Sequence, residues 1–241
     1  MDGELDRTEP AGRRLTAIFA KRPEPGRVKT RLSPPLTPEE ASTLADAMLE
    51  DSVRRGDAAG AGSRCRLLFA PEEAGPWFRK RFPGSPELAA QRGPGLAERL
   101  ASFFEHALAE PDVGTAVAVG SDAPHVPAAR LAAAHRTLEA GADVVLGLDA
   151  GGGYYLIGMR RAHPELFLDV PMSTGEMGRQ TVALARSLGL RTELLEEDYD
   201  VDVEADLRRL ARDLAGADPG AEDFPRATAR VLATLSIDAG A

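Results

Sequence analysis

The sequence predicts an α/β fold, a three-layer α/β/α sandwich around a mostly parallel mixed sheet. From Leu15 onward, short apolar runs alternate with amphipathic stretches, which is typical of βα units. The chain has 241 residues and is 43% hydrophobic, enough to bury one large core. It contains no internal repeat and no long low-complexity linker. We therefore expect a flexible tail over residues 1–13 and a single domain over residues 14–236.

The order of the expected elements follows from their apolar spacing. Continuous apolar runs predict buried strands, and apolar residues recurring every three or four positions predict helices. The first helix also has Thr37 as an N-cap candidate and Pro38 at its first position. We expect strands over residues 15–20, 65–70, 115–120, 142–148, 154–159 and 191–196, and helices over 37–55, 95–110, 127–140, 175–188, 203–214 and 226–235.

Composition excludes several classes of function. With 29 basic and 38 acidic residues, the net charge is -9, so we expect no nucleic-acid partner. Cys65 is the only cysteine, which excludes an internal disulfide. No apolar run approaches the roughly 20 residues that span a membrane, and the polar first residues do not resemble a signal peptide. The expected location is the cytoplasm, with no membrane partner.

A basic stretch, "KRPEPGRVKTRL" over residues 21–32, directly follows the first expected strand. Its two prolines and Gly26 predict a loop rather than a helix. Such a loop lies at the carboxyl edge of the sheet, where ligands bind in α/β folds. Lys29 and Arg31 are two residues apart, so in an extended segment they would face the same side and could bind successive phosphates. The alternative is a solvated basic turn.

Acidic residues follow other strands in the same way. Asp122 comes directly after the strand expected over residues 115–120, and Asp200 and Asp202 precede a helix at a spacing of two. Carboxylates at such positions suit Mg²⁺ or Mn²⁺, which take oxygen ligands and bridge to phosphates. The alternatives are a turn for Asp122 and a helix cap for Asp202.

Two further stretches have both structural and functional interpretations. Glycines at residues 151–153 precede a strand, which indicates either a close backbone approach to a ligand or a tight loop feeding a hairpin. Ser173 and Thr174 stand near an expected helix start, where they could cap the helix or contact an oxyanion. The four histidines show no metal-ligand spacing, and none lies near Cys65 in the sequence. Cysteine–histidine nucleophilic catalysis therefore has no support.

Several of these stretches, in order over residues 15–210, resemble a known bacterial family. The stretches are "FAKRPEPGRVKTRL", "QRGPGLAERL", "GSDAPHVP", "GGYYLIG", the Ser173–Thr174 pair and "DVDVEADL". They resemble domain-of-unknown-function family 2064, which is grouped with glycosyltransferases of the GT-A superfamily. The segment "VKTRL" is also similar to the basic loop of 2-phospholactate guanylyltransferases. The resemblance implies a nucleotide-diphospho-sugar transferase fold, with residues 14–236 as a GT-A-like nucleotide-binding transferase domain.

The resemblance also implies roles for individual residues. Nucleotidyltransferases of this superfamily hold a triphosphate on the basic loop, contact the base through a glutamine, and bind metal through an aspartate at a strand tip and another on a late loop. Carried over, the catalytic residues are Lys29, Arg31 and Asp122. The implied nucleotide-binding residues are Lys21, Gly26, Lys29, Arg31 and Gln91; the substrate-binding residues are Gly152, Gly153, Tyr154, Ser173 and Thr174; and the metal ligands are Asp122 with Asp200 or Asp202.

The chain departs from the family pattern at three positions. Gly151 stands where the family has an acidic residue, although Asp149 lies two residues earlier. Met172 replaces a tryptophan, and Ala97 replaces a glycine. These changes surround the expected base and acceptor pocket rather than the phosphate loop.

Together, these patterns predict a Mg²⁺-dependent or Mn²⁺-dependent transferase. We expect nucleotidyl transfer from a nucleoside triphosphate to a small phosphorylated or anionic acceptor, with release of pyrophosphate. The alternatives are glycosyl transfer from a nucleotide sugar to a small acceptor and a non-catalytic nucleotide-binding regulator. The expected partners are the nucleotide, the small-molecule acceptor and a second copy of the chain in a homodimer.

Overall fold

The computed structural model describes residues 13–59 and 63–235. Within these ranges the strands form one seven-stranded sheet in the order β3-β2-β1-β4-β6-β5-β7. Strand β6 runs antiparallel to β4 and β5, and the other neighbouring pairs are parallel. The predicted α/β class with a mostly parallel mixed sheet is confirmed.

The elements have the following bounds. The strands are β1 (Arg13–Lys21), β2 (Ser63–Ala70), β3 (Glu87–Ala90), β4 (Val113–Gly120), β5 (Val144–Leu148), β6 (Tyr154–Met159) and β7 (Thr192–Leu194). The α-helices are α1 (Pro38–Asp57), α2 (Gly75–Arg81), α3 (Leu96–Ala107), α4 (Ala128–Glu139), α5 (Glu165–Leu168), α6 (Met177–Ser187), α7 (Glu204–Gly216) and α8 (Arg226–Leu232). Two short 3₁₀ helices are η1 (Thr30–Leu32) and η2 (Glu72–Ala74).

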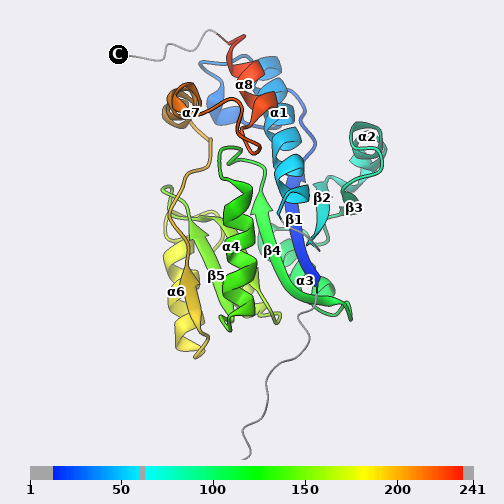
Figure 1. Cartoon of the computed structure of the whole chain (residues 1–241), viewed down its shortest axis with the longest axis vertical. Helices are drawn as coiled ribbons and strands as arrows, with labels where there is room; N and C mark the ends of the chain where they lie inside the picture. The colour runs from blue at the N-terminus through cyan, green and yellow to red at the C-terminus, as the bar shows by residue number, and fades with distance from the viewer. Residues whose placement is uncertain (1–12, 60–62, 236–241) are drawn as a thin grey trace, which may run out of the picture.

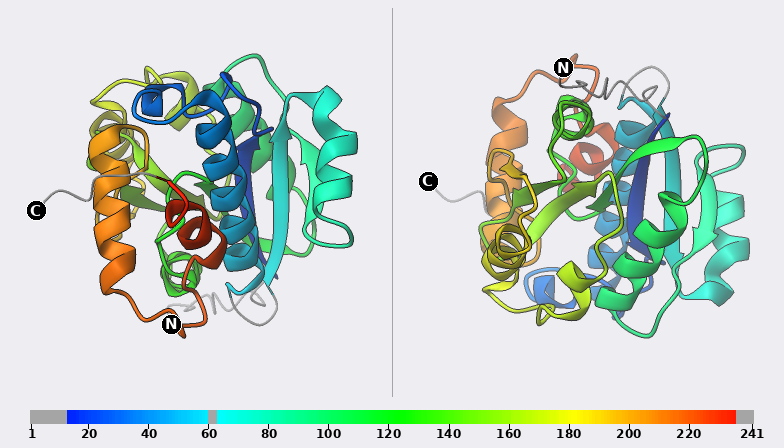
Figure 2. Two further views of the ribbon diagram at one scale, coloured as in Figure 1. Left: turned by 90° about the horizontal axis from the view of Figure 1, so that it is seen from above. Right: turned by 90° about the horizontal axis from the view of Figure 1, so that it is seen from below.

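Helices cover both faces of the sheet, as the two end-on views show (Figure 2). Strand β1 is buried on both faces, which explains its continuous apolar sequence. Its residues Ile18 and Ala20 face a core that includes side chains of α1 and α4. Leu15 and Ala17 face the opposite core, built with α3, α5 and α6. This alternation is the period of two that a strand imposes.

His135 on α4 is a polar side chain buried between this helix and the sheet. The ring of His135 on α4 is fully buried and bonds through Nε2 to Thr16 Oγ1 at 3.0 Å and through Nδ1 to Thr115 Oγ1 at 2.8 Å. Both ring nitrogens are therefore satisfied by strand side chains, one as donor and one as acceptor. This histidine is a structural element of the core.

A third apolar cluster packs residues 32–36, which follow the basic loop, against α1 and α7. Leu32 and Leu36 are buried together with Leu44 on α1 and with Leu207 and Leu210 on α7. Figure 1 shows α7 and α8 gathered at one end of the sheet, beside α1. This end carries the carboxyl termini of β1 and β4, so the cluster holds the basic loop where the two strands finish.

The expected elements are found, with five omissions and some shifted bounds. The sequence did not predict α2, β3, α5, η1 or η2. The helix α2 is seven residues long with a proline in its first turn, and β3 has only four partly exposed residues, so neither produces a clear period. Strand β7 is shorter than expected, and α6 begins at Met177 rather than 175.

Nearly all of the tail expected over residues 1–13 lies outside the described residues. Strand β1 already begins at Arg13, the last residue of the expected tail, whereas residues 1–12 and 236–241 lie outside the described chain. Among the helices of residues 13–59 and 63–235, none combines the length and the apolar character needed to cross a bilayer.

Candidate functional site

A cavity of about 1210 Å³ lies at the carboxyl edge of the sheet. It is lined by the loop after β1, the turn after β4, the start of β6, and loops before α6 and α7. Of the residues predicted for the site, it brings together Lys21, Lys29, Arg31, Gln91, Asp122, Gly153, Tyr154, Ser173, Thr174, Asp200 and Asp202. Gly26 and Gly152 are not part of the lining.

Lys29 joins the basic loop to the acidic residues. Its Nζ lies 2.6 Å from Asp122 Oδ1 and 3.1 Å from Asp202 Oδ1, and it donates to the carbonyl of Val201 at 2.8 Å. The Lys29 side chain is only 5% exposed, whereas the two carboxylates are about half exposed. Burial alone would lower the pKa of Lys29, but the two carboxylates outweigh burial and raise it. The ammonium is therefore a fixed charge between two strand-tip loops.

The conformation of the basic loop differs from the extended one that the sequence suggested. Lys29 has a left-handed backbone, with φ of 48°, and the next residues form the 3₁₀ helix η1. As a result, Lys29 and Arg31 do not extend side by side: Lys29 is buried against the carboxylates, and Arg31 is exposed at the cavity. The expected pairing of the two side chains on one side of a strand is wrong for this reason.

The other cations of the loop divide into two groups. Arg22 and Arg27 both lie near the carboxylate of Glu24, at 3.2 Å and 3.8 Å. Lys21 and Arg31 are exposed, line the cavity and form no ion pair with any other described residue. These two side chains are the ones that remain available to an anion in the cavity.

Acidic as well as basic side chains line the cavity. Five carboxylates line it, those of Asp122, Asp149, Asp200, Asp202 and Asp206. Asp206 is engaged at the start of α7, where it accepts from the backbone N–H groups of Asp202 and Val203. Asp200 Oδ1 is buried and has no hydrogen-bond partner within the described structure. Burial, reinforced by the nearby charges of Asp122 and Asp149, raises the pKa of Asp200 to about 8.

The oxygen atoms of these carboxylates are suitable ligands for a divalent cation, but they are not already arranged around a metal position. Mg²⁺ and Mn²⁺ prefer hard oxygen donors, and the orphaned oxygen of Asp200 needs a partner. Among residues 13–59 and 63–235, however, no three acidic, histidine or cysteine side chains are already arranged as metal ligands. Between Asp122 and Asp202, the position of a cation is taken by the Lys29 ammonium.

Gln91 lines the cavity directly after β3. Its Nε2 donates to the carbonyls of Ala20 at 3.1 Å and Leu68 at 2.8 Å, so the amide ties together the ends of β1 and β2. Its Oε1 accepts from Arg99 at 3.3 Å. Because both amide hydrogens are used inside the protein, only the carbonyl oxygen could contact a nucleobase without rearrangement.

The glycine turn before β6 has a structural reason. Gly152 has φ of +91°, and a Cβ there would overlap the backbone carbonyl of Gly175 in the loop before α6. Its function in the structure is therefore a close approach between two loops. At Gly151, the backbone N–H donates to Asp149 Oδ1 at 2.5 Å, and a Cβ would crowd that carboxylate. Asp149 thus lies directly beside the Gly151 backbone.

The other residues predicted to bind substrate, Ser173, Thr174 and Tyr154, line the same cavity. Ser173 has a left-handed backbone with φ of 60°, and Thr174 Oγ1 donates to the carbonyl of Pro171 at 3.3 Å. Neither side chain caps α6, whose N-cap is Glu176. The hydroxyl of Tyr154 is buried, has no partner among the described residues, and its pKa is raised by burial. Tyr154 lines the cavity, although its hydroxyl oxygen is closed off from solvent.

Sequence reasoning missed two cationic lining residues, Arg27 and Arg99. Arg99 donates from Nε to the carbonyl of Gly93 at 2.9 Å and so orders the turn before α3. A lone arginine in a helix is usually on the surface, so its position alone carries no signal. The weak signal was that Arg99 falls inside the "QRGPGLAERL" stretch that carried the resemblance.

Comparison with known proteins confirms the predicted resemblance. Residues 57–174 match the family model described as "Uncharacterized protein conserved in bacteria (DUF2064)". None of the curated proteins matches the chain. The match to the family model spans the segment from the end of α1 to the loop before α6, which includes Gln91, Asp122 and Tyr154.

Solved structures confirm the fold. A "putative nucleotide-diphospho-sugar transferase" from Desulfovibrio desulfuricans G20 is 27% identical, covers 92% of this chain and 94% of its own, and has a TM-score of 0.83. A nucleotidyl transferase from Methanothermobacter is 14% identical over 83% of this chain and 97% of its own, with a TM-score of 0.54. CMP:2-keto-3-deoxy-manno-octonic acid synthetase, solved with CTP, is 12% identical over 84% and 98%, with a TM-score of 0.52. The chain has the fold of nucleotide-activated transferases.

Proposed function

We propose that the protein is a metal-dependent transferase that uses a nucleoside triphosphate and transfers the nucleotidyl group to a small anionic acceptor. The observation that carries this proposal is the Lys29 ammonium held between Asp122 and Asp202, with the exposed cations Lys21 and Arg31 at the same cavity. A cavity that combines available cations with several carboxylates suits a polyphosphate together with its metal.

The proposed chemistry is an in-line displacement. An acceptor oxyanion attacks the α-phosphorus, the bond to the bridging oxygen of the β-phosphate breaks, and pyrophosphate leaves with the electron pair. Because the nucleophile is already anionic, no general base is needed. Lys21 and Arg31 would bind the phosphates, whereas Lys29 would act by holding the Asp122 and Asp202 carboxylates, because its three N–H donors are already engaged there. Cations at the leaving group stabilise the charge that develops there.

The metal would be held by Asp122 with Asp200 or Asp202, which are the carboxylates around Lys29. When bound, a divalent cation supplies Lewis-acid polarisation of the phosphoryl oxygens. Asp149 would take the place of the acidic residue that Gly151 lacks, because its carboxylate lies directly beside that backbone N–H. Tyr154 would contact the substrate as part of the cavity lining.

The direct test is thermal stabilisation of the purified chain by ATP, GTP, CTP, UTP and a panel of nucleotide sugars, with and without Mg²⁺. A ligand that binds only the native state raises the apparent stability by mass action. We expect a Mg²⁺-dependent shift from one triphosphate that is lost in Asp122→Asn. Incubation with candidate phosphorylated acceptors should then release pyrophosphate. Absence of a shift from every nucleotide would refute the assignment.

Glycosyl transfer from a nucleotide sugar is the second candidate. It is favoured by the Desulfovibrio protein, which is described as a "putative nucleotide-diphospho-sugar transferase" and resembles the chain over 92% of its length. Product analysis separates the two reactions, because glycosyl transfer releases a nucleoside diphosphate rather than pyrophosphate. A thermal shift with nucleotide sugars alone would also favour this candidate.

A non-catalytic nucleotide-binding regulator is a further alternative, and it rests on Gly151. If the native chain binds a nucleotide without turnover, and Gly151→Asp creates turnover, the regulator is correct. Since a side chain at this position would crowd Asp149, we expect Gly151→Asp to disturb the site rather than complete it.

A further inference from the structure

Arg55 is a buried arginine in the last turn of α1, only 6% exposed. It falls on the same helical face as Leu44, Met48 and Ser52, at spacings of four, four and three residues. The other three residues of this stripe are apolar or small. An arginine that occupies a core position needs compensating contacts, because a buried charge is costly unless it is paired and hydrogen-bonded.

The contacts of Arg55 are backbone carbonyls of the turn after β4. Its Nη1 donates to the carbonyl of Ala123 and, at 3.0 Å, to that of Val126. Burial lowers the pKa of Arg55 to about 10, an effect opposed first by the charge of Asp51 and then by that of Asp198. The guanidinium therefore keeps its charge at neutral pH while it holds two carbonyls of one turn.

This turn is the one that carries Asp122. Ala123 follows it directly, and the carbonyl of Ser121 before it accepts from Ser52 Oγ on α1 at 3.5 Å. The carbonyl of Asp122 itself accepts from the backbone N–H of Val201 at 2.9 Å. The backbone around Asp122 is thus fixed by α1 on one side and by the late acidic loop on the other.

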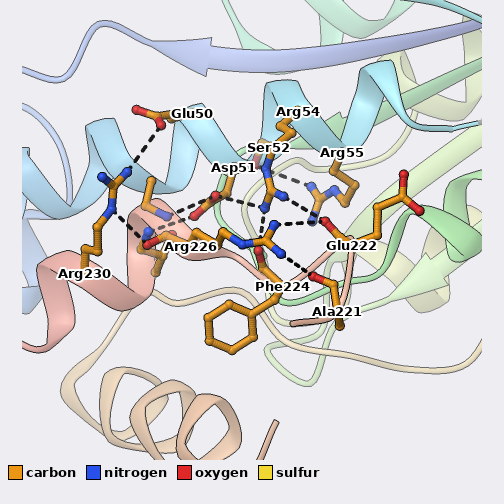
Figure 3. Close-up of polar contacts among 12 residues, drawn as sticks. Glu50, Asp51, Ser52, Arg54, Arg55, Ala221, Glu222, Phe224, Arg226 and Arg230 are labelled. Carbon is orange, nitrogen blue, oxygen red and sulfur yellow. Dashed lines mark hydrogen bonds and ion pairs between the residues drawn. The ribbon is translucent and has the colours of Figure 1, made fainter. Parts of the chain in front are cut away.

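Two neighbouring residues of α1, Asp51 and Arg54, contact the C-terminal segment instead (Figure 3). Asp51 accepts from the backbone N–H groups of Ala227 at 3.2 Å and Thr228 at 2.7 Å. Arg54 donates to the carbonyls of Glu222 at 2.8 Å and Phe224. Two consecutive arginines therefore hold different parts of the fold, and Arg54 provides a matched control for Arg55.

We propose that Arg55 is a positioning residue that fixes the turn around Asp122 so that the Asp122 carboxylate stays directed at the cavity. This inference rests on the proposed function, in which Asp122 binds the metal of the nucleotide complex. Arginine suits the task because its planar guanidinium presents several N–H donors at fixed angles. Both carbonyls accept from one nitrogen, Nη1, while Nη2 donates to Ser52 Oγ at 3.5 Å, which itself contacts the Ser121 carbonyl. A lysine ammonium has a single nitrogen on a flexible stem and would not make both sets of contacts.

The test compares Arg55→Lys and Arg55→Met with Arg54→Gln in the full chain. Mn²⁺ affinity is measured directly by calorimetry without nucleotide, with Asp122→Asn to show that the metal uses this site. Exchange of the Val201 amide, which bonds to the Asp122 carbonyl, is followed in metal-free protein. For both Arg55 variants we expect Mn²⁺ affinity to fall by about 10-fold to 100-fold, the usual effect of losing a residue that orients a ligand. The Val201 amide should also exchange faster.

Arg54→Gln should leave Mn²⁺ affinity unchanged and speed exchange at the amides of Ala227 and Thr228 instead. Arg55→Lys with native Mn²⁺ affinity and native Val201 exchange would overturn the proposal, as would equal effects of the two arginines on Mn²⁺. If the native chain binds Mn²⁺ through Asp122 but reacts with no nucleotide, the proposed function fails and the role of Arg55 stands. If the native chain binds no Mn²⁺ through Asp122, both fail.

Discussion

Lys29 Nζ lies 2.6 Å from Asp122 Oδ1, which joins the loop after β1 to the turn after β4 across the carboxyl edge of the sheet. The lysine side chain is almost fully buried, whereas the aspartate is about half exposed. The pair therefore presents a carboxylate to the cavity and keeps its counter-charge beneath it. Lys29 also stabilises the fold itself, because it binds Asp202 and the carbonyl of Val201.

Lys29→Met should reduce both stability and nucleotide affinity. The substitution leaves two partly solvated carboxylates and one carbonyl without their donor, which we expect to lower the free energy of unfolding by about 1–3 kcal/mol. Urea unfolding at pH 7 measures this loss. Mg²⁺ should recover more stability in the variant than in the native chain, because a divalent cation can replace the missing positive charge between Asp122 and Asp202.

Lys21→Met is the control for this change, because Lys21 belongs to the same loop but is exposed. It should leave the urea midpoint unchanged. Equal stability of the two variants would mean that the Lys29 contacts contribute nothing to the fold.

Arg31→Ala should weaken nucleotide binding without affecting stability. Arg31 is exposed at the cavity and makes no ion pair within the described residues, so its removal should change the free energy of unfolding by less than about 0.5 kcal/mol. Loss of a charge-assisted contact to phosphate should raise the Kd of the nucleotide by about 10-fold to 100-fold. Calorimetry at two salt concentrations measures it, with exposed Arg79 on α2 as the control for net charge.

The sequence was sufficient to predict the sheet and the grouping of the loops at the carboxyl ends of its strands. The run at residues 15–20 is apolar on both faces because β1 lies between two helical layers, an arrangement typical of parallel strands in α/β folds. Since the carboxyl ends of parallel strands share one edge, Lys21 and Asp122 had to approach each other. The order of the elements was therefore sufficient to predict most of the residues that line the cavity.

The directions of individual side chains could not be predicted. Lys29 turns toward the carboxylates because of a left-handed backbone followed by a 3₁₀ turn, and the packing of Leu32 beneath α7 holds that geometry. Such a conformation depends on tertiary contacts rather than on local propensity. The same applies to Arg55, which occupies a core position that only the spacing from Leu44 and Met48 hints at.

Gly152→Ala should destabilise the protein more than Gly26→Ala. Both glycines have a positive φ, +91° and +72°, so both substitutions carry the backbone strain of a left-handed residue, about 1 kcal/mol. A Cβ at Gly152 also overlaps the carbonyl of Gly175, whereas a Cβ at Gly26 meets open space. We expect a further loss of roughly 2 kcal/mol or more at Gly152, since the loop before α6 must shift. Urea unfolding of the two variants measures the difference; equal losses would contradict the close packing of these loops.

His135 should make the protein less stable in acid. Burial, with a smaller effect from the charge of Arg14, lowers the pKa of His135 to about 4, whereas an unfolded histidine titrates near 6.5. The unfolded chain therefore binds more protons between these values, so the stability from this residue is complete above pH 6.5 and is lost as the pH falls toward 4. The loss should reach about 2–3 kcal/mol in urea unfolding at pH 4.5 relative to pH 7.5.

His135→Gln should remove this component of the pH dependence, although it lowers stability at pH 7.5 by disturbing the bonds to Thr16 and Thr115. His106→Gln, at an exposed position on α3, should keep the native slope, and an unchanged slope in His135→Gln would show that the histidine titrates normally in the folded protein.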